Sequence, residues 1–213
     1  GSILSALAAG IPQTVEITLA SFVVAAVVGL PLAILRRSGG WGLRLPAVVV
    51  VEGLRAVPPI VWLFIIYYAL GTDVVKLSTF QAAVAGLGLI YAAHLSEVYR
   101  AGLDAVPAGQ WEAVRALALP RTQAYARVIL PQAFVVVIPP MASFAIALLK
   151  DSAIASVIGA NDITFHAAQL TQQDLNGFGN FAVAGLLYIV LSIPFATISR
   201  GADRLLARRL AVA

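Results

Sequence analysis

The stretch that decides the fold is "QWEAVRALALPRTQAYARVILPQAF", residues 110–134, which lies between two long apolar segments. It sets four charged side chains among Ala and Leu at helical spacing, and Pro120 and Pro131 divide it. Apolar residues that recur every three or four positions predict amphipathic helices, and proline marks where such helices end. The stretch therefore predicts two short helices joined by a turn, inside a chain otherwise suited to lipid.

The composition is that of a membrane protein. The chain has 213 residues, of which 61% are hydrophobic and 11% are charged, whereas soluble domains are about half apolar and about a quarter charged. Because there is no cysteine, a disulfide, a thiol nucleophile and a cysteine-ligated metal are excluded. No phosphate-binding loop of the Gly-x-x-x-x-Gly-Lys-Ser/Thr type occurs, so the chain does not hydrolyse ATP by that route. We expect neither a catalytic nor a metal site.

Five segments are long and apolar enough to cross a bilayer, which takes roughly 20 helical residues. They are residues 14–35, 46–70, 79–99, a span within 132–158, and residues 180–198. This pattern predicts an all-α integral membrane protein with five transmembrane helices. The charged hairpin would then connect the third span to the fourth.

The basic residues predict the orientation of these spans. Eleven of the fourteen fall on one side of the predicted membrane: Arg36, Arg37, Arg44, Arg100, Arg115, Arg121, Arg127, Arg200, Arg204, Arg208 and Arg209. Lys76 is the only basic residue in the opposite loops. By the positive-inside rule the N-terminus is outside and the C-terminus is cytoplasmic, as five spans require. The net charge of +4 thus reflects membrane topology rather than a nucleic-acid partner.

The hairpin has two interpretations on pattern alone. Its first helix is expected to carry Trp111, Val114, Leu117 and Ala118 on one face. The hairpin could project from the membrane toward a protein, or it could lie on lipid headgroups with its arginines paired to phosphates.

The segment "EAVRALALPRTQAYARVILP" resembles the EAA loop of ABC importer permeases, whose pattern is E-A-A-x3-G-x9-I-x-L-P. Four positions match at the full spacing: Glu112, Ala113, Leu130 and Pro131. Val128 conservatively replaces Ile, while Val114 and Ala118 depart from Ala and Gly. Because glycine is the residue that readily adopts positive φ, we expect the turn at Ala118 to use another geometry, helped by Pro120.

The resemblance extends over nearly the whole chain. "VEGLRAVPPIVWLFIIYYAL", "AAHLSEVYRAGLDAVPAGQWEA" and "LLKDSAIASVIG" are similar, in order and spacing, to elements of the polar amino acid subfamily. The resemblance implies a single permease domain over residues 1–213, with the coupling-helix loop at about 101–131, in a bacterial cytoplasmic (inner) membrane. It implies a transport subunit rather than an enzyme.

The resemblance also implies the partners. They are a second permease chain, two cytoplasmic ATPase subunits that hold ATP and Mg²⁺, an external substrate-binding protein, and a polar amino acid or related zwitterion. This chain itself would bind no cofactor. The departures from the family pattern favour a non-identical second permease. In the family the loop seats in a cleft on the ATPase, which implies ATPase contacts by Trp111, Glu112, Ala113, Arg115, Leu117 and Ala118.

Ionisable residues at membrane depth are costly and indicate function. His94 and Glu97 share a helix face, and Lys150 and Asp151 follow a long uncharged run. A carboxylate can hold an ammonium group and a lysine a carboxylate, as a zwitterion needs. In the subfamily such positions line a substrate pocket, which implies substrate binding by His94, Glu97, Lys150, Asp151 and Ser152.

Alternatives remain at this point. Glu97 and Lys150 could form a structural ion pair, or the relay of an ion-coupled secondary carrier or channel. They meet only if the fourth span begins after Pro139 and Pro140, with residues 132–138 at the interface. A non-transporting structural or receptor subunit is a third class. Acidic, basic, amide and cystine-like substrates, opines and ectoine all stay open, and the outer segment 158–178 could dock the binding protein or cap the outer mouth.

Overall fold

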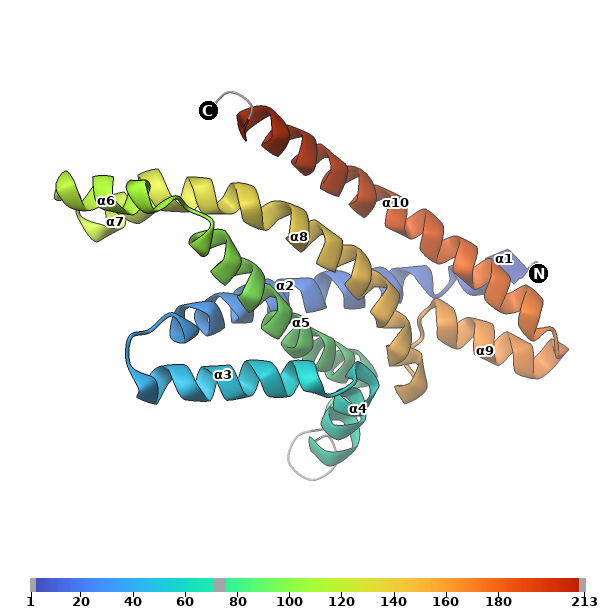
Figure 1. Ribbon diagram of the computed structural model, residues 1–213. Helices are drawn as coiled ribbons and strands as arrows, with labels where there is room; N and C mark the ends of the chain where they lie inside the picture. The colour runs from blue at the N-terminus through green and yellow to red at the C-terminus, as the bar shows by residue number, and fades with distance from the viewer. Residues whose placement is uncertain (1–2, 71–75, 211–213) are drawn as a thin grey trace.

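The computed structural model describes residues 3–70 and 76–210, and every element in these ranges is helical. Four stretches are long and apolar enough to cross a membrane: Ile3–Arg36, Thr79–Asp104, Arg121–Ile158 and Gly177–Ile198. They contain α1 (Ile3–Ala8), α2 (Ile11–Arg36), α5 (Thr79–Asp104), α8 (Leu130–Asp151) and α10 (Gly177–Leu210). Figure 1 shows α2, α8 and α10 extending across the molecule, with α5 crossing α2. The predicted all-α membrane class is confirmed.

The second predicted span is a bent pair rather than one straight helix. It consists of α3 (Trp41–Ala56) and α4 (Pro59–Phe64), which continues as the π-helix η1 (Ile65–Leu70), and the two parts meet at 105°. Val57 and Pro58 have extended backbone at the break, because a residue that precedes proline is driven out of the helical region. The described chain therefore has four spans, or five if the bent pair counts as one.

The helix break at Pro139 and Pro140, which a contact between Glu97 and Lys150 would require, is absent. Both prolines lie inside α8, which runs without interruption from Leu130 to Asp151 and continues as the 3₁₀-helix η3 (Ser152–Ile158). Helices in membranes tolerate internal proline when neighbouring helices and hydroxyl side chains satisfy freed backbone groups.

The core forms where α2, α5 and α8 meet. Helices α2 and α5 make the most extensive helix–helix contact, and it depends on small residues. A Cβ added at Gly29 would lie 2.9 Å from the carbonyl oxygen of Ala92, and one at Gly88 would lie 2.7 Å from Val24 Cγ1. Larger side chains there would hold the two backbones apart. The large side chains that the core buries completely include Ile17, Leu87, Leu95 and Leu148.

A second, smaller cluster lies at the other end of the molecule. The predicted outer segment contains α9 (Ile163–Asp174), which packs against α1 and α10. The cluster buries Leu7, Ile163, Ala167 and Ala184. Asp162 caps α9, since its Oδ1 accepts a hydrogen bond from the backbone N–H of Phe165 at 2.7 Å.

The predicted hairpin is present between α5 and α8. It comprises α6 (Ala108–Ala116), α7 (Arg121–Gln123) and the π-helix η2 (Ala124–Ile129), which runs directly into α8. Figure 1 shows α6 and α7 beyond the end of α2, away from α9. Trp111 and Val128 pack against Val106, Ile129 and Ala133, so the hairpin is anchored to α8 by its own apolar cluster.

Candidate functional site

The turn of the hairpin corrects the expectation at Ala118. Ala118 has φ 49°, the left-handed conformation that glycine adopts readily. Its N–H donates to the carbonyl of Arg115 at 3.0 Å, and the N–H of Leu119 donates to that of Val114 at 3.1 Å. This pair of hydrogen bonds defines a Schellman motif, which requires a residue in the left-handed conformation at the position of Ala118. The turn therefore keeps the left-handed geometry that a glycine at this position would favour, and Ala118 adopts it at a cost in backbone strain.

Helix α6 has two different faces. Glu112, Ala113 and Leu117 are exposed on the outer face, and Leu117 is 71% exposed. The opposite face carries Trp111 and Arg115, while Val114 between them is buried. The single face expected from spacing is therefore wrong for Leu117, which points away from the others. Of the six predicted ATPase contacts, Glu112, Ala113 and Leu117 lie on the outer face and Trp111, Arg115 and Ala118 line a cavity.

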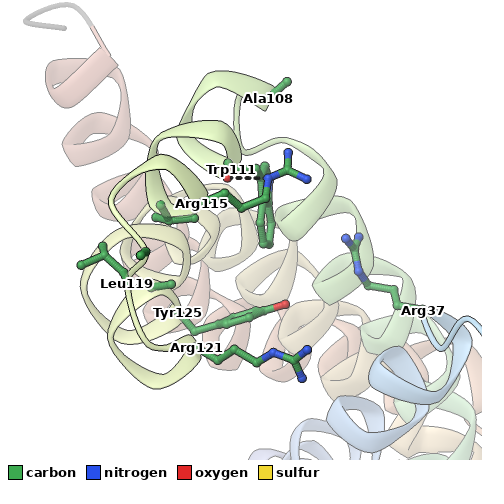
Figure 2. Close-up of a pocket in the computed structure, with 10 residues that line it drawn as sticks. Arg37, Ala108, Trp111, Arg115, Leu119, Arg121 and Tyr125 are labelled. Carbon is green, nitrogen blue, oxygen red and sulfur yellow. Dashed lines mark hydrogen bonds between the residues drawn. The ribbon is translucent and has the colours of Figure 1, made fainter.

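That cavity lies between the hairpin and the end of α2. It measures about 690 Å³ and is lined by α6, α7, η2 and Arg37. Trp111 and Tyr125 meet edge to face across it, with ring centres 5.8 Å apart. Arg37, Arg115 and Arg121 also line it, and Figure 2 shows their guanidinium groups directed toward a common space beside the two rings.

Next to the cavity, ion pairs join α2, α3 and α5. Glu97 is the centre: Arg36 of α2 donates to its Oε1, and Arg100 donates from Nε and Nη2 to its Oε2 at 3.1 and 3.0 Å. Arg55 of α3 approaches Glu97 to 3.7 Å, and it also pairs with Glu52 at 3.5 Å. The partners of Glu97 are therefore arginines from α2, α3 and α5.

The same network reaches the cavity through Asp104. Arg37 and Arg100 both donate to this carboxylate, Arg100 from Nη1 at 3.0 Å. We call the seven residues the ion-pair cluster: Arg36, Arg37, Glu52, Arg55, Glu97, Arg100 and Asp104. Because α2, α3 and α5 each contribute, the cluster fixes three helices at one end of the molecule.

Farther along α5, a polar group faces the end of α8. Tyr91 donates its hydroxyl to Asp151 Oδ2 at 2.8 Å. His94 stacks on Phe144 with ring centres 5.3 Å apart and an interplanar angle of 26°. Phe144 also lines a cavity of about 580 Å³ whose other walls come from α8, including both of its internal prolines. His94 and Asp151 are therefore brought together, through Tyr91 and Phe144.

The remaining predicted substrate residues lie elsewhere. Ser152 is buried, and its hydroxyl donates to the carbonyl of Leu149 at 2.8 Å. Lys150 is exposed and lines a groove of about 480 Å³ between α8 and α10, together with Tyr188 and Arg200. Within the part of the chain that the structure describes, Lys150 makes no ion pair.

One titratable group outside the spans is buried. Asp162 lies in the connection before α9 and has no solvent exposure. Burial raises the pKa of Asp162 to about 7, against the opposing effect of the N–H of Phe165, which donates to the carboxylate. The protonated form of this carboxyl is therefore favoured across the acidic range.

The relatives of the chain agree with this architecture. The family of binding-protein-dependent transport system inner membrane components matches residues 4–212. The chain belongs to this family. It is the membrane-spanning permease component of such a system and lies in the inner membrane. Members of this class work with a separate ATPase and a substrate-binding protein.

Individual relatives span almost the whole permease. A probable amino-acid ABC transporter permease protein, y4tG of Sinorhizobium fredii (strain NBRC 101917 / NGR234), is 34% identical over 208 residues, covering 98% of this chain and 90% of the relative. The L-cystine transport system permease protein TcyB of Bacillus subtilis (strain 168) is 34% identical over 207 residues, covering 95% and 88%. A crystal structure of an amino acid ABC transporter with histidines superimposes with a TM-score of 0.87 at 30% identity, covering 94% of both chains.

The structure of the permease also shows residues that sequence reasoning missed. Tyr91 lies three positions before His94, so the spacing that placed His94 and Glu97 on one face could have found it. Phe144 carries no polar signal in an apolar helix. Arg36 was interpreted only as a topology charge, and its role as partner of Glu97 depends on the packing of α2 against α5.

Proposed function

We propose that this permease imports a polar amino acid or related zwitterion, with its N-terminus outside and its C-terminus in the cytoplasm. The hairpin then lies in the cytoplasm, where it meets the ATPase. The relatives whose names state a substrate support the class: amino acids in general, L-cystine, and octopine, whose transport permease OccM in Rhizobium radiobacter is 33% identical over 200 residues.

The observation that carries the proposal is the outer face of α6. An apolar side chain that is 71% exposed, Leu117, lies on the same outer face of α6 as the exposed Glu112. A single exposed leucine does not mark a contact by itself; what supports the assignment is its place in the segment that resembles the family's coupling loop. Leu117 would pack into a cleft of the ATPase, and Glu112 would pair with a basic residue at its rim. The hairpin would transmit ATPase motion as a rigid body, since its own cluster ties it to α8.

Substrate recognition is assigned to the middle of α5 and the C-terminal end of α8. Asp151 would hold the ammonium group of the substrate. Tyr91 would orient the carboxylate of Asp151 through their 2.8 Å hydrogen bond. The stacked His94 and Phe144 rings form the adjoining wall. Lys150 and Ser152 flank Asp151 in the sequence. Glu97 would hold helices in position rather than bind substrate, because Arg36 and Arg100 donate to its carboxylate.

The complete importer would contain two permease chains, two ATPase subunits with ATP and Mg²⁺, and an external binding protein. It would work by alternating access, driven by the ATPase subunits. ATP hydrolysis belongs to those partners. The departures from the family pattern at Ala56, Val57, Val114 and Ala118 favour a second permease that differs from this one. An ion relay through Glu97 and Lys150 receives no support, because Glu97 pairs with arginines.

Co-purification tests the role of the outer face. We expect Glu112→Arg to lose the ATPase subunits from the solubilised complex, because the reversed charge repels a basic rim. Gln123→Arg, which adds a positive charge elsewhere on the hairpin, should retain them. Equal ATPase recovery in both variants would remove the outer face of α6 from the interface.

A further inference from the structure

The cavity inside the hairpin is separate from the face assigned to the ATPase. Arg115 and Trp111 line it, whereas Glu112 and Leu117 lie on the other side of α6. Its volume, about 690 Å³, is within the range of small-molecule and headgroup sites. A ligand could therefore occupy it while the outer face contacts a protein.

The lining of the cavity has excess positive charge. Arg37 is balanced by Asp104 in the ion-pair cluster. Arg115 uses its Nε to donate to the carbonyl of Trp111 at 3.1 Å, which fixes the side chain and leaves both Nη groups for a ligand. Among the described residues, no carboxylate lines the cavity and none pairs with Arg121. Two guanidinium groups thus have no carboxylate partner among the described residues, and Figure 2 shows that of Arg115 beside Trp111 and that of Arg121 beside Tyr125.

The position of the cavity matches the headgroup layer of a bilayer. Arg37 follows directly on the last residue of the span Ile3–Arg36, and Arg121 is the first residue of the span Arg121–Ile158. The cavity therefore lies where the hairpin meets the end of the span that contains α2. Trp111 and Tyr125 beside it are the aromatic types enriched at membrane–water interfaces.

We propose that this cavity binds the phosphodiester headgroup of an anionic phospholipid. Guanidinium groups bind phosphate oxygens in bidentate geometry, and basic pockets between helix ends on the cytoplasmic side accept lipid headgroups. Arg115 and Arg121 hold the phosphate, Arg37 closes the side toward α2, and the two aromatic rings contact the glycerol. A bound lipid would brace the hairpin against α2 without touching its outer face.

The test uses the permease purified together with its ATPase subunits in nanodiscs of phosphatidylcholine and phosphatidylglycerol. Native mass spectrometry measures the phosphatidylglycerol retained by the complex as its mole fraction in the disc is varied. The double variant Arg115→Gln/Arg121→Gln removes the proposed ligands. The matched control Arg44→Gln/Arg127→Gln removes the same charge from exposed arginines outside the cavity.

We expect the apparent affinity for phosphatidylglycerol to fall about 30-fold in the cavity variant, at about fivefold for each arginine. The control should change it less than about twofold, and Arg115→Lys/Arg121→Lys should give an intermediate value because charge remains without the bidentate geometry. Recovery of ATPase and an unchanged melting temperature show that the variants are folded.

Three results would overturn the proposal. Equal losses in the cavity and control variants would mean that the lipid responds only to total charge. Displacement of phosphatidylglycerol by millimolar inorganic phosphate would make the cavity a site for free anions. Loss of ATPase from the cavity variant, with lipid retained, would assign these arginines to an acidic segment of the ATPase.

Discussion

Replacing Ala118 with glycine should stabilise the hairpin. Ala118 has φ 49°, and the left-handed conformation costs an alanine about 1–2 kcal/mol. Glycine loses about 0.5–1 kcal/mol more backbone entropy than alanine when it is ordered. The balance favours Ala118→Gly by about 0.5–1 kcal/mol, which is roughly a two- to fivefold change in the equilibrium for local opening.

Amide hydrogen exchange of the permease in nanodiscs measures this equilibrium where it matters. The N–H of Leu119, which donates to Val114 at 3.1 Å, should exchange roughly two- to fivefold more slowly in Ala118→Gly. Ala116→Gly is the matched control, since Ala116 is an exposed residue of α6 in the right-handed helix. There the same substitution should accelerate exchange, at a cost of about 0.5–1 kcal/mol.

The two glycine variants must therefore change exchange in opposite directions. If Ala118→Gly accelerates the exchange of Leu119 or leaves it unchanged, the turn stores no left-handed strain. The reasoning that connects the family glycine with this turn would then be refuted.

Three further substitutions, two of them with a control variant, test the helix contacts and the buried carboxyl. Glu97→Gln should lower the free energy of unfolding in detergent by about 1–3 kcal/mol, because its arginine partners lose a half-buried carboxylate. As the control, Glu52→Gln should lower the same free energy by less than about 1 kcal/mol, since the side chain of Glu52 is 54% exposed. Gly88→Ala should lower the melting temperature, since overpacking costs about 1–3 kcal/mol, whereas Gly53→Ala, with open space around it, should not lower it. Burial raises the pKa of Asp162 from its ordinary value near 3.8 to about 7, so the folded state binds more protons than the unfolded chain and stability must fall as pH rises from about 4 through 7. Asp162→Asn should flatten that slope in melting curves, and an unchanged slope would show that another group titrates.

The hairpin and the membrane class could be predicted because their signals are local. Pro120 marks the turn between the two helices, and charge at helical spacing distinguishes the hairpin from the apolar segments beside it. Pro131 ends no helix, because η2 runs directly into α8. The bend between α3 and α4 also has a local cause in Pro58 and Pro59, but hydropathy averages over such a break. Proline thus ended a helix in one span and was accommodated inside α8 in another. Whether a proline breaks its helix depends on how the neighbouring helices pack around it, which the sequence does not show.

The candidate site depended on contacts between distant segments. Spacing correctly placed His94 and Glu97 on α5, but the two residues have different partners. The stacking of His94 on Phe144 and the ion pair of Glu97 with Arg36 both require the arrangement of α2, α5 and α8. The hypothesis that Glu97 pairs with Lys150 rested on charge complementarity alone. In the structure, arginines that lie closer bind the carboxylate of Glu97.

Uptake into proteoliposomes tests the central claim most directly. The permease would be reconstituted with its ATPase subunits, ATP inside and the loaded binding protein outside, and labelled amino acid would be counted in the lumen. We predict uptake that requires ATP and the ATPase, is lost in Glu112→Arg, and persists in Gln123→Arg. Uptake that follows an ion gradient without any ATPase would contradict the account.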